Sequence, residues 1–197
     1  MSVLIEPNLI VTLSGSEQAV TPSTYEYSYK RNVFLFSEIN NSSAQSMINQ
    51  LMALDDISHQ DITLIINSPG GSVSDALAII DTMQTMHSDV RTVCIGLAAS
   101  MAAVILAAGT KGKRFITPRA KVMIHQPLGG IQGQASDISK LCEEITKTKN
   151  NITEFLSERT GQSMERLTAD MDRDYWLNSG EAVVYGIVDK ILKGDEL

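Results

Sequence analysis

Cysteine and histidine are scarce in this chain of 197 residues, which contains two cysteines and three histidines. Cys94 and Cys142 do not form a CxxC pair, so they imply neither a disulfide framework nor a zinc site. Cys142 lies in a helical pattern without a histidine nearby in sequence, which favours a buried apolar residue over a nucleophile. We expect no metal site and no cofactor bound by this chain.

Basic residues are also few, with 16 Lys and Arg against 23 Asp and Glu and a net charge of −7. Binding to duplex nucleic acid relies on clustered Lys and Arg, so the composition argues against a nucleic-acid-binding protein. Small molecules and polypeptides stay open as substrates.

Long apolar runs are absent as well. The most apolar stretch, residues 93–108, is interrupted by Gly96 and Ser100 and is too short to span a bilayer. The first residues lack the basic region and apolar core of a signal peptide, and Gly194–Leu197 matches a retention signal only loosely. We expect no membrane association and a cytoplasmic location.

Short apolar segments alternate with amphipathic ones, which predicts an α/β domain with a largely parallel sheet. Strands are expected at residues 32–36, 62–66, 90–95, 114–116 and 122–124. Apolar residues at helical spacing predict helices over residues 44–52, 76–86, 100–108 and 136–160, after Ser163, and over 181–185. The glycine-rich stretch 128–134 is expected to lie outside the sheet.

The segment 136–160 is unusually long for a helix in a domain of this size. Its apolar stripe consists of Ile138, Leu141, Ile145, Ile152 and Leu156. Gly161 follows the last helical residue, a position where glycine commonly ends a helix. Since the rest of its surface is charged, we expect the helix to project and meet another subunit.

A turn of small residues is expected to begin at Gly96 after the predicted strand, and it leads to Ser100 at the start of a helix. The free N–H groups of a helix N-terminus favour an oxyanion, as acyl transfer requires. A serine at this position is also a common helix cap. Two interpretations, nucleophile and cap, are therefore open for Ser100.

A second turn, Asn67–Gly71, follows the neighbouring strand. Its two glycines allow a backbone to approach a ligand closely, although an ordinary turn is the simpler interpretation. Both turns come at the carboxyl ends of predicted parallel strands, where open α/β sheets place their sites.

The three histidines differ in context. His59 lies in a polar linker and His87 near a helix end, where solvated or capping roles are expected. His125 directly follows a buried strand and is the natural base for Ser100, although a structural role is also open. The carboxylate that orients such a base is either Asp172 or Asp174, and spacing does not choose between them.

Several segments closely resemble the proteolytic subunit of the Clp protease. They are Asn67–Gly71, Gly96–Met101, Val122–Gly130, Gln132–Asp137, Asp172–Asp174 and Glu181–Gly186. The resemblance runs in order from roughly Asp61 to Leu192, and its His125-Gln126-Pro127 segment is highly specific.

This resemblance implies a ClpP/crotonase-like α/β fold, a repeated β-β-α superhelix with a protruding handle helix. It implies a serine endopeptidase with Ser100 as nucleophile, His125 as base and Asp174 as its orienting carboxylate. Gly71 and Met101 would supply the N–H groups of the oxyanion hole. Residues 32–197 would form one peptidase domain, with the handle at about 128–160.

The resemblance also implies an assembly of two stacked heptameric rings around a closed chamber, with Asp172 and Arg173 in the contact between rings. Unfolded polypeptides would be delivered by a AAA+ unfoldase, the partner that consumes ATP.

Departures from the family pattern lie in the N-terminal third. The segment Tyr25–Arg31 is shorter than the family's helix there, Ser37-Glu38 replaces a typical glycine, and Thr63 and Ile65 stand where aromatic residues are common. Because these positions help form the axial pore and the docking clefts, residues 1–31 are expected to be a divergent axial segment. They also leave open a mixed particle with a paralogous subunit.

Three other functions compete with this one. A crotonase-type acyl-CoA enzyme would not need Ser100, His125 and Asp174 together. A signal-peptide peptidase would use a Ser–Lys dyad and a membrane segment. An inactive structural subunit would not need an intact triad.

Overall fold

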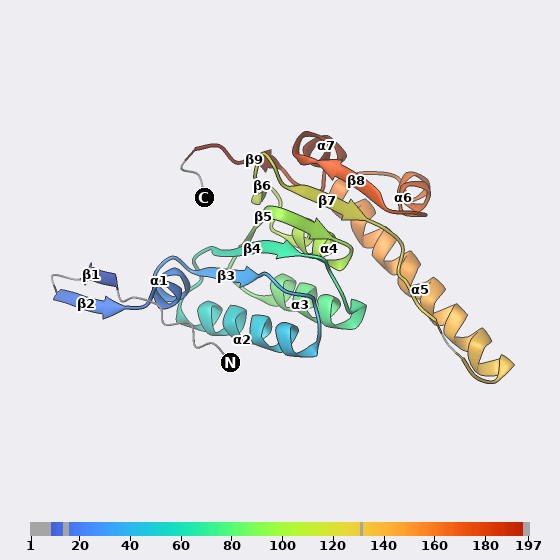
Figure 1. Ribbon diagram of the computed structural model, residues 1–197, viewed down its shortest axis with the longest axis horizontal. Coiled ribbons are helices and arrows are strands. Elements are labelled where there is room, and N and C mark those ends of the chain that lie inside the picture. The colour runs from blue at the N-terminus through green and yellow to red at the C-terminus, as the bar shows by residue number, and fades with distance from the viewer. Residues whose placement is uncertain (1–8, 14–15, 131, 195–197) are drawn as a thin grey trace.

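The computed structural model describes residues 9–13, 16–130 and 132–194, with a seven-stranded main sheet among them (Figure 1). Its strands are β3 (Asn32–Leu35), β4 (Ile62–Ser68), β5 (Val90–Ala99), β6 (Arg114–Ile116), β7 (Lys121–Ile124), β8 (Tyr175–Asn178) and β9 (Lys190–Ile191). The order is β3-β4-β5-β6-β9, while β7 pairs with both β5 and β8. Only the β7–β8 pairing is antiparallel within this sheet, so the predicted α/β fold class with a mostly parallel sheet is confirmed.

Helices connect the strands and cover the sheet. In the described residues they are α1 (Pro22–Ser28), α2 (Asn41–Ile57), α3 (Val73–Thr85), α4 (Met101–Ala108), α5 (Ala135–Thr160), α6 (Met164–Asp170) and α7 (Ser179–Tyr185). Every residue of α4 is buried, as expected of a helix that is apolar all round. The α4 helix therefore lies in the core, directly behind the end of β5.

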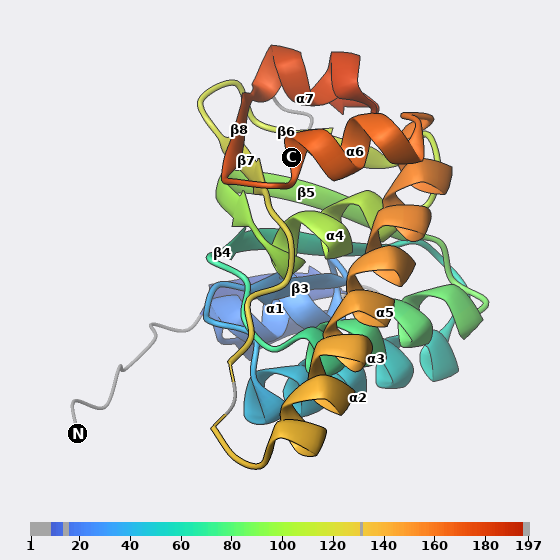
Figure 2. The ribbon, with the colours of Figure 1, turned by 90° about the vertical axis from the view of Figure 1, so that its right-hand side faces the viewer.

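The long predicted helix is confirmed as α5. It ends at Gly161, whose left-handed backbone (φ 78°) closes the helix without the steric cost of a Cβ atom. Ile152 and Leu156 in its C-terminal half are buried, whereas Ile138 near its N-terminus is exposed. The N-terminal half of α5 extends away from the sheet (Figure 1), and the C-terminal half packs beside α4 and α6 (Figure 2).

The prediction that Gly96 begins the turn before Ser100 is wrong, because β5 continues through Gly96 to Ala99. The pairing with β4 shifts register here, from Ile66–Cys94 to Ser68–Ala98. Gly96 has φ 73°, and a Cβ atom on it would lie 2.8 Å from Asn67 Oδ1. This glycine therefore forms a bulge inside the strand.

The strands at the two ends of the chain were not predicted. Near the N-terminus β1 (Leu9–Leu13) and β2 (Ser16–Val20) form an antiparallel hairpin, which lies apart from the main sheet (Figure 1). Near the C-terminus β8 and β9 have only four and two residues. Among the described residues no helix is both long and apolar enough to cross a membrane.

Candidate active site

The bulge at Gly96 determines where Ser100 lies. Before the bulge β5 pairs with β6, and after it Leu97–Ala99 pair with Lys121–Met123 of β7. The Ser100 N–H group then donates a hydrogen bond to the Met123 carbonyl (2.8 Å). This exchange of partners brings the end of β5 beside the end of β7, which His125 follows.

Ser100 has an unusual backbone, with φ 55° and ψ −126°. A positive φ is rare for residues other than glycine and marks a sharp turn between strand and helix. The Ser100 side chain makes no capping hydrogen bond to α4. Its Oγ instead lies 2.8 Å from His125 Nε2, so the geometry does not support the capping interpretation.

The other ring nitrogen of His125 faces Asp174. His125 Nδ1 lies 3.2 Å from Asp174 Oδ1. The antiparallel pairing of β7 with β8 places Ile124 opposite Tyr175. His125, which follows Ile124, and Asp174, which precedes Tyr175, therefore lie at adjacent strand ends. The structure thus brings Ser100, His125 and Asp174 into one line of contacts, a geometry suited to proton transfer from the hydroxyl.

Asp172 points elsewhere. Gln126 Nε2 donates to the Asp172 carbonyl oxygen (3.0 Å) and lies 3.4 Å from Asp172 Oδ1. Arg173 is 91 % exposed and has one weak ion pair, 3.9 Å from Asp172. Of the two carboxylates that spacing left open, Asp174 is the one that contacts the His125 ring.

The glycine turn after β4 packs against Ser100. A Cβ atom on Gly70 would lie 2.5 Å from the Ala99 carbonyl and 2.8 Å from Ser100 Cβ, so no side chain fits there. Gly70 donates its N–H to Ser68 Oγ, which holds the turn in place. Gly71 has φ 147°, and a Cβ atom on it would lie 2.2 Å from the Ile39 carbonyl oxygen.

Two backbone N–H groups stay available near the hydroxyl. In the described part of the chain, neither Gly71 nor Met101 donates its N–H to a protein acceptor. Met101 is the first residue of α4, where the positive end of the helix dipole lies. The two groups can bind an oxygen that acquires negative charge.

A pocket of about 240 Å³ opens beside Ser100 and His125. Its walls are mostly apolar and come from distant parts of the chain: the turn after β4 with the start of α3, α4, the end of β7 with the segment after it, α5, and the residue after α6. The lining includes Val73, Val104, Pro127, Ile152, Leu156 and Met171. The sequence pattern does not reveal this pocket, because its residues are dispersed along the chain and are ordinary core residues by type.

A further contact joins the site to α5. Lys149 Nζ donates to Gln126 Oε1 (2.8 Å), and Gln126 in turn holds the Asp172 carbonyl. The Gln126 N–H also donates to the Met171 carbonyl (2.7 Å). From sequence Gln126 stood out only as part of a motif, and Lys149 was missed because one lysine on a charged helix gives no signal.

The cysteines lie outside this arrangement. Burial raises the pKa of Cys94 to about 12, so its thiol stays protonated at neutral pH. Cys142 is exposed on α5, not buried as expected, and does not line the pocket. Neither cysteine therefore lines the pocket beside Ser100 and His125.

A family model described as Clp protease matches residues 15–195 of the chain. The match covers most of the sequence, from the N-terminal hairpin to the last described strand. It includes every residue of the Ser100 site and confirms the resemblance that the sequence motifs indicated.

Proposed function

The chain belongs to the Clp protease family and is therefore a peptidase, and we propose that it is a serine endopeptidase with Ser100 as nucleophile. The observation that carries this proposal is the 2.8 Å contact of Ser100 Oγ with His125 Nε2, at a serine held in a strained turn. The turn places Ser100 at the carboxyl end of β5, where it lines the pocket that a peptide side chain can enter.

Acylation follows from the positions of the three side chains. Ser100 Oγ attacks the peptide carbonyl carbon while His125 Nε2 accepts the hydroxyl proton. Asp174 accepts a hydrogen bond from His125 Nδ1–H, which fixes the tautomer and stabilises the imidazolium that forms. His125 then gives its proton to the leaving amine, the C–N bond breaks, and an acyl-enzyme remains.

The tetrahedral intermediate carries a negative oxygen, and Gly71 and Met101 donate their N–H groups to it. One such donor contributes about 3–4 kcal/mol to transition-state stabilisation in a comparable oxyanion hole. Water activated by His125 then hydrolyses the ester by the reverse sequence of proton transfers. No metal or cofactor takes part in this scheme.

The apolar pocket gives the enzyme its preference among peptide side chains. Because its walls are formed mainly by residues such as Val104, Leu156 and Met171, an apolar side chain gains burial energy there. We expect cleavage after apolar residues of an extended, unfolded chain.

The functional particle in this proposal is an oligomer of two stacked heptameric rings in the cytoplasm, formed by this chain alone or together with a paralogous subunit. A AAA+ unfoldase binds the rings and consumes the ATP. Asp172 and Arg173 contribute to the contact between rings. The projecting half of α5 and the high exposure of Arg173 support this arrangement, since both are suited to contact with another subunit.

Substitution of Ser100 tests the proposal. We expect Ser100→Ala to abolish labelling by a fluorophosphonate or β-lactone and to lower peptide hydrolysis by several orders of magnitude, as removal of a triad serine does. Native mass spectrometry should show the same oligomer as the wild type. Labelling that persists in this variant would refute Ser100 as the nucleophile.

A further inference from the structure

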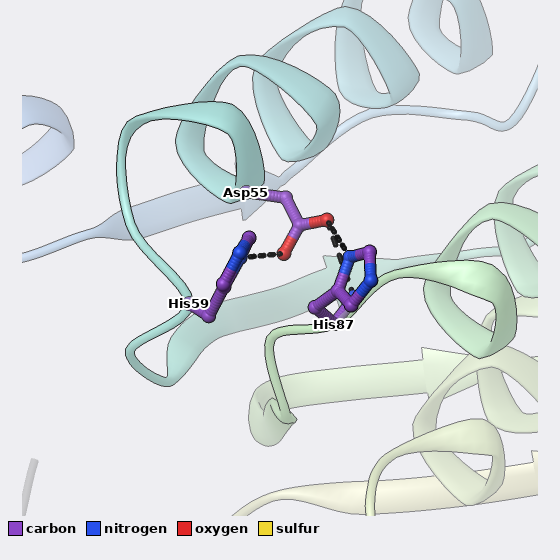
Figure 3. A group of neighbouring side chains, drawn as sticks. All are labelled: Asp55, His59 and His87. Carbon is purple, nitrogen blue, oxygen red and sulfur yellow. Dashed lines mark hydrogen bonds and ion pairs between the residues drawn. The ribbon is translucent and has the colours of Figure 1, made fainter.

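A second cluster of chemically active side chains lies away from Ser100. It contains Asp55 in the last turn of α2, His59 in the loop before β4, and His87 in the loop before β5 (Figure 3). These loops lead into the amino ends of β4 and β5 (Figure 1), whereas Ser100 follows the carboxyl end of β5. The cluster is therefore at the opposite edge of the sheet from the proposed active site.

The carboxylate of Asp55 is buried and firmly held. Its Oδ1 accepts hydrogen bonds from the Ser88 N–H (2.8 Å) and the Ser88 hydroxyl (2.7 Å). Its Oδ2 accepts one from the His87 N–H (3.2 Å). These contacts tie the end of α2 to the loop before β5, so one ligand position is fixed before any ion binds.

The two imidazoles contact this carboxylate from the solvent side. His59 Nδ1 lies 3.4 Å from Oδ1 and His87 Nδ1 lies 3.6 Å from Oδ2. Both separations exceed the roughly 2.7–3.2 Å of a good hydrogen bond from nitrogen to oxygen. They are close to the distance of about 3.3 Å between two ligand atoms of a tetrahedral zinc ion, given metal–ligand bonds of about 2.0–2.1 Å.

The histidine side chains are free to complete such a site. Their rings stack at 4.7 Å between centroids, and one ligand atom from each of the three residues lies within 4.8 Å of the others. The side chains are 63 % and 77 % exposed, so small rotations can bring both nitrogens to one ion. The fourth coordination position of a tetrahedral ion would be open to solvent.

We propose that Asp55, His59 and His87 form a surface site for a Zn²⁺ ion. Two imidazoles and one carboxylate suit zinc, whereas calcium and magnesium need more oxygen ligands than this cluster offers. The Arg31 guanidinium lies 3.5 Å from Ser88 Oγ and opposes the charge of the ion. We therefore expect weaker binding than in a closed four-ligand zinc site. A bound ion would link α2 to the loop before β5.

Calorimetric titration of the metal-free full-length protein with ZnCl₂ tests this site. We expect one equivalent to bind per subunit and the melting temperature to rise with zinc concentration. His59→Ala and His87→Ala should each weaken binding by about 10–100-fold or more, the loss usual even for outer-shell changes at a metal site. Substitution with Co²⁺ should give the intense visible absorption of a tetrahedral ion, and both variants should lose it.

Two matched variants show whether zinc binding belongs to this cluster. Asp56→Asn removes an exposed charge from the same turn of α2 and should leave the affinity unchanged. His125→Ala removes the remaining histidine and should also leave the equivalent bound. Absence of zinc binding, or binding that survives in the His59→Ala/His87→Ala double variant, would overturn the proposal.

Discussion

Ser100 holds its strained backbone because its neighbours leave it little freedom. The Met123 carbonyl binds its N–H, Gly70 fills the space against its Cβ, and the buried α4 helix follows directly. A residue in a sparsely populated backbone region costs about 1–3 kcal/mol, which the surrounding packing has to offset. The hydroxyl is thus positioned before substrate binds. The free-energy cost of the strained backbone therefore lowers the stability of the fold and does not add to the activation barrier.

Asp189 and Arg114 form the most buried ion pair of the described chain. Arg114 Nη2 lies 2.6 Å from Oδ1 and Arg114 Nε 3.1 Å from Oδ2, and the arginine side chain is only 5 % exposed. Burial alone would raise the pKa of Asp189, but hydrogen bonds and charge from Arg114 outweigh it and lower the pKa. The fold therefore favours the ionised carboxylate.

We expect Asp189→Asn to lower the free energy of unfolding by about 3 kcal/mol, because it leaves a buried guanidinium without its counter-charge. In the wild type this stabilisation is complete above the unfolded pKa of about 3.9 and is lost as pH falls below it towards the native pKa. Urea denaturation at fixed protomer concentration, at neutral and acidic pH, measures both effects.

Asp61→Asn is the matched control, since Asp61 is half-exposed and its ion pair with Lys113 should contribute about 1 kcal/mol at most. A loss in Asp189→Asn no larger than in this control would contradict the assigned role of the buried pair.

Sequence reasoning reached Ser100 and His125 from their strand ends, because the carboxyl ends of parallel strands meet at one edge. The spacing of residues could not decide which carboxylate, Asp172 or Asp174, faces His125. Both lie in the same short segment, and the direction of each side chain depends on the local backbone, which the spacing does not encode. Sequence reasoning also assigned solvated or capping roles to His59 and His87. Their meeting at Asp55 depends on how two loops pack, which local patterns do not encode.

Among the secondary-structure elements, those with strong periodicity or long apolar runs were predicted well. The periodic α5 helix and the apolar α4 helix agree with expectation to within one residue. The β8 and β9 strands were missed because two to four residues carry no period. A glycine at position 96 is compatible with either a turn or a bulge within a strand. It forms a bulge because β5 continues past it and changes its partner from β6 to β7.

The α5 helix contacts the proposed active site through one polar connection. Lys149 holds the Gln126 side chain, and Gln126 holds the carbonyl of Asp172, two residues before Asp174. A net hydrogen bond contributes about 1 kcal/mol. We expect Lys149→Met to lower kcat/KM for a short peptide about fivefold by loosening the Asp174 loop, with Ser100 still labelled by the probe.

Lys147→Met is the matched control for this connection. Lys147 lies on the same helix, but its partner is Glu144, and both side chains are exposed. The control should keep wild-type kinetics. Equal kinetics in the two variants would show that Lys149 does not position the site.

At the scale of the whole molecule, two surface features of the single chain are suited to contact with another subunit. The apolar residue Ile138 is exposed near the start of α5, where the helix projects away from the sheet. Arg173 stands beside Asp174 with almost its entire side chain in solvent. A projecting helix and an exposed arginine next to the carboxylate of the proposed triad favour a site that is completed by assembly.

This arrangement predicts that assembly and activity are coupled through Arg173. An ion pair with the opposite ring would hold the loop that carries Asp174, so loss of the guanidinium should weaken ring stacking and misplace the carboxylate together. We expect Arg173→Ala to shift the particle towards single rings in native mass spectrometry and to lower peptide hydrolysis in proportion. Lys111→Ala, which removes an exposed positive charge from the loop between α4 and β6, should do neither. A fully active single ring would separate the two effects and refute the coupling.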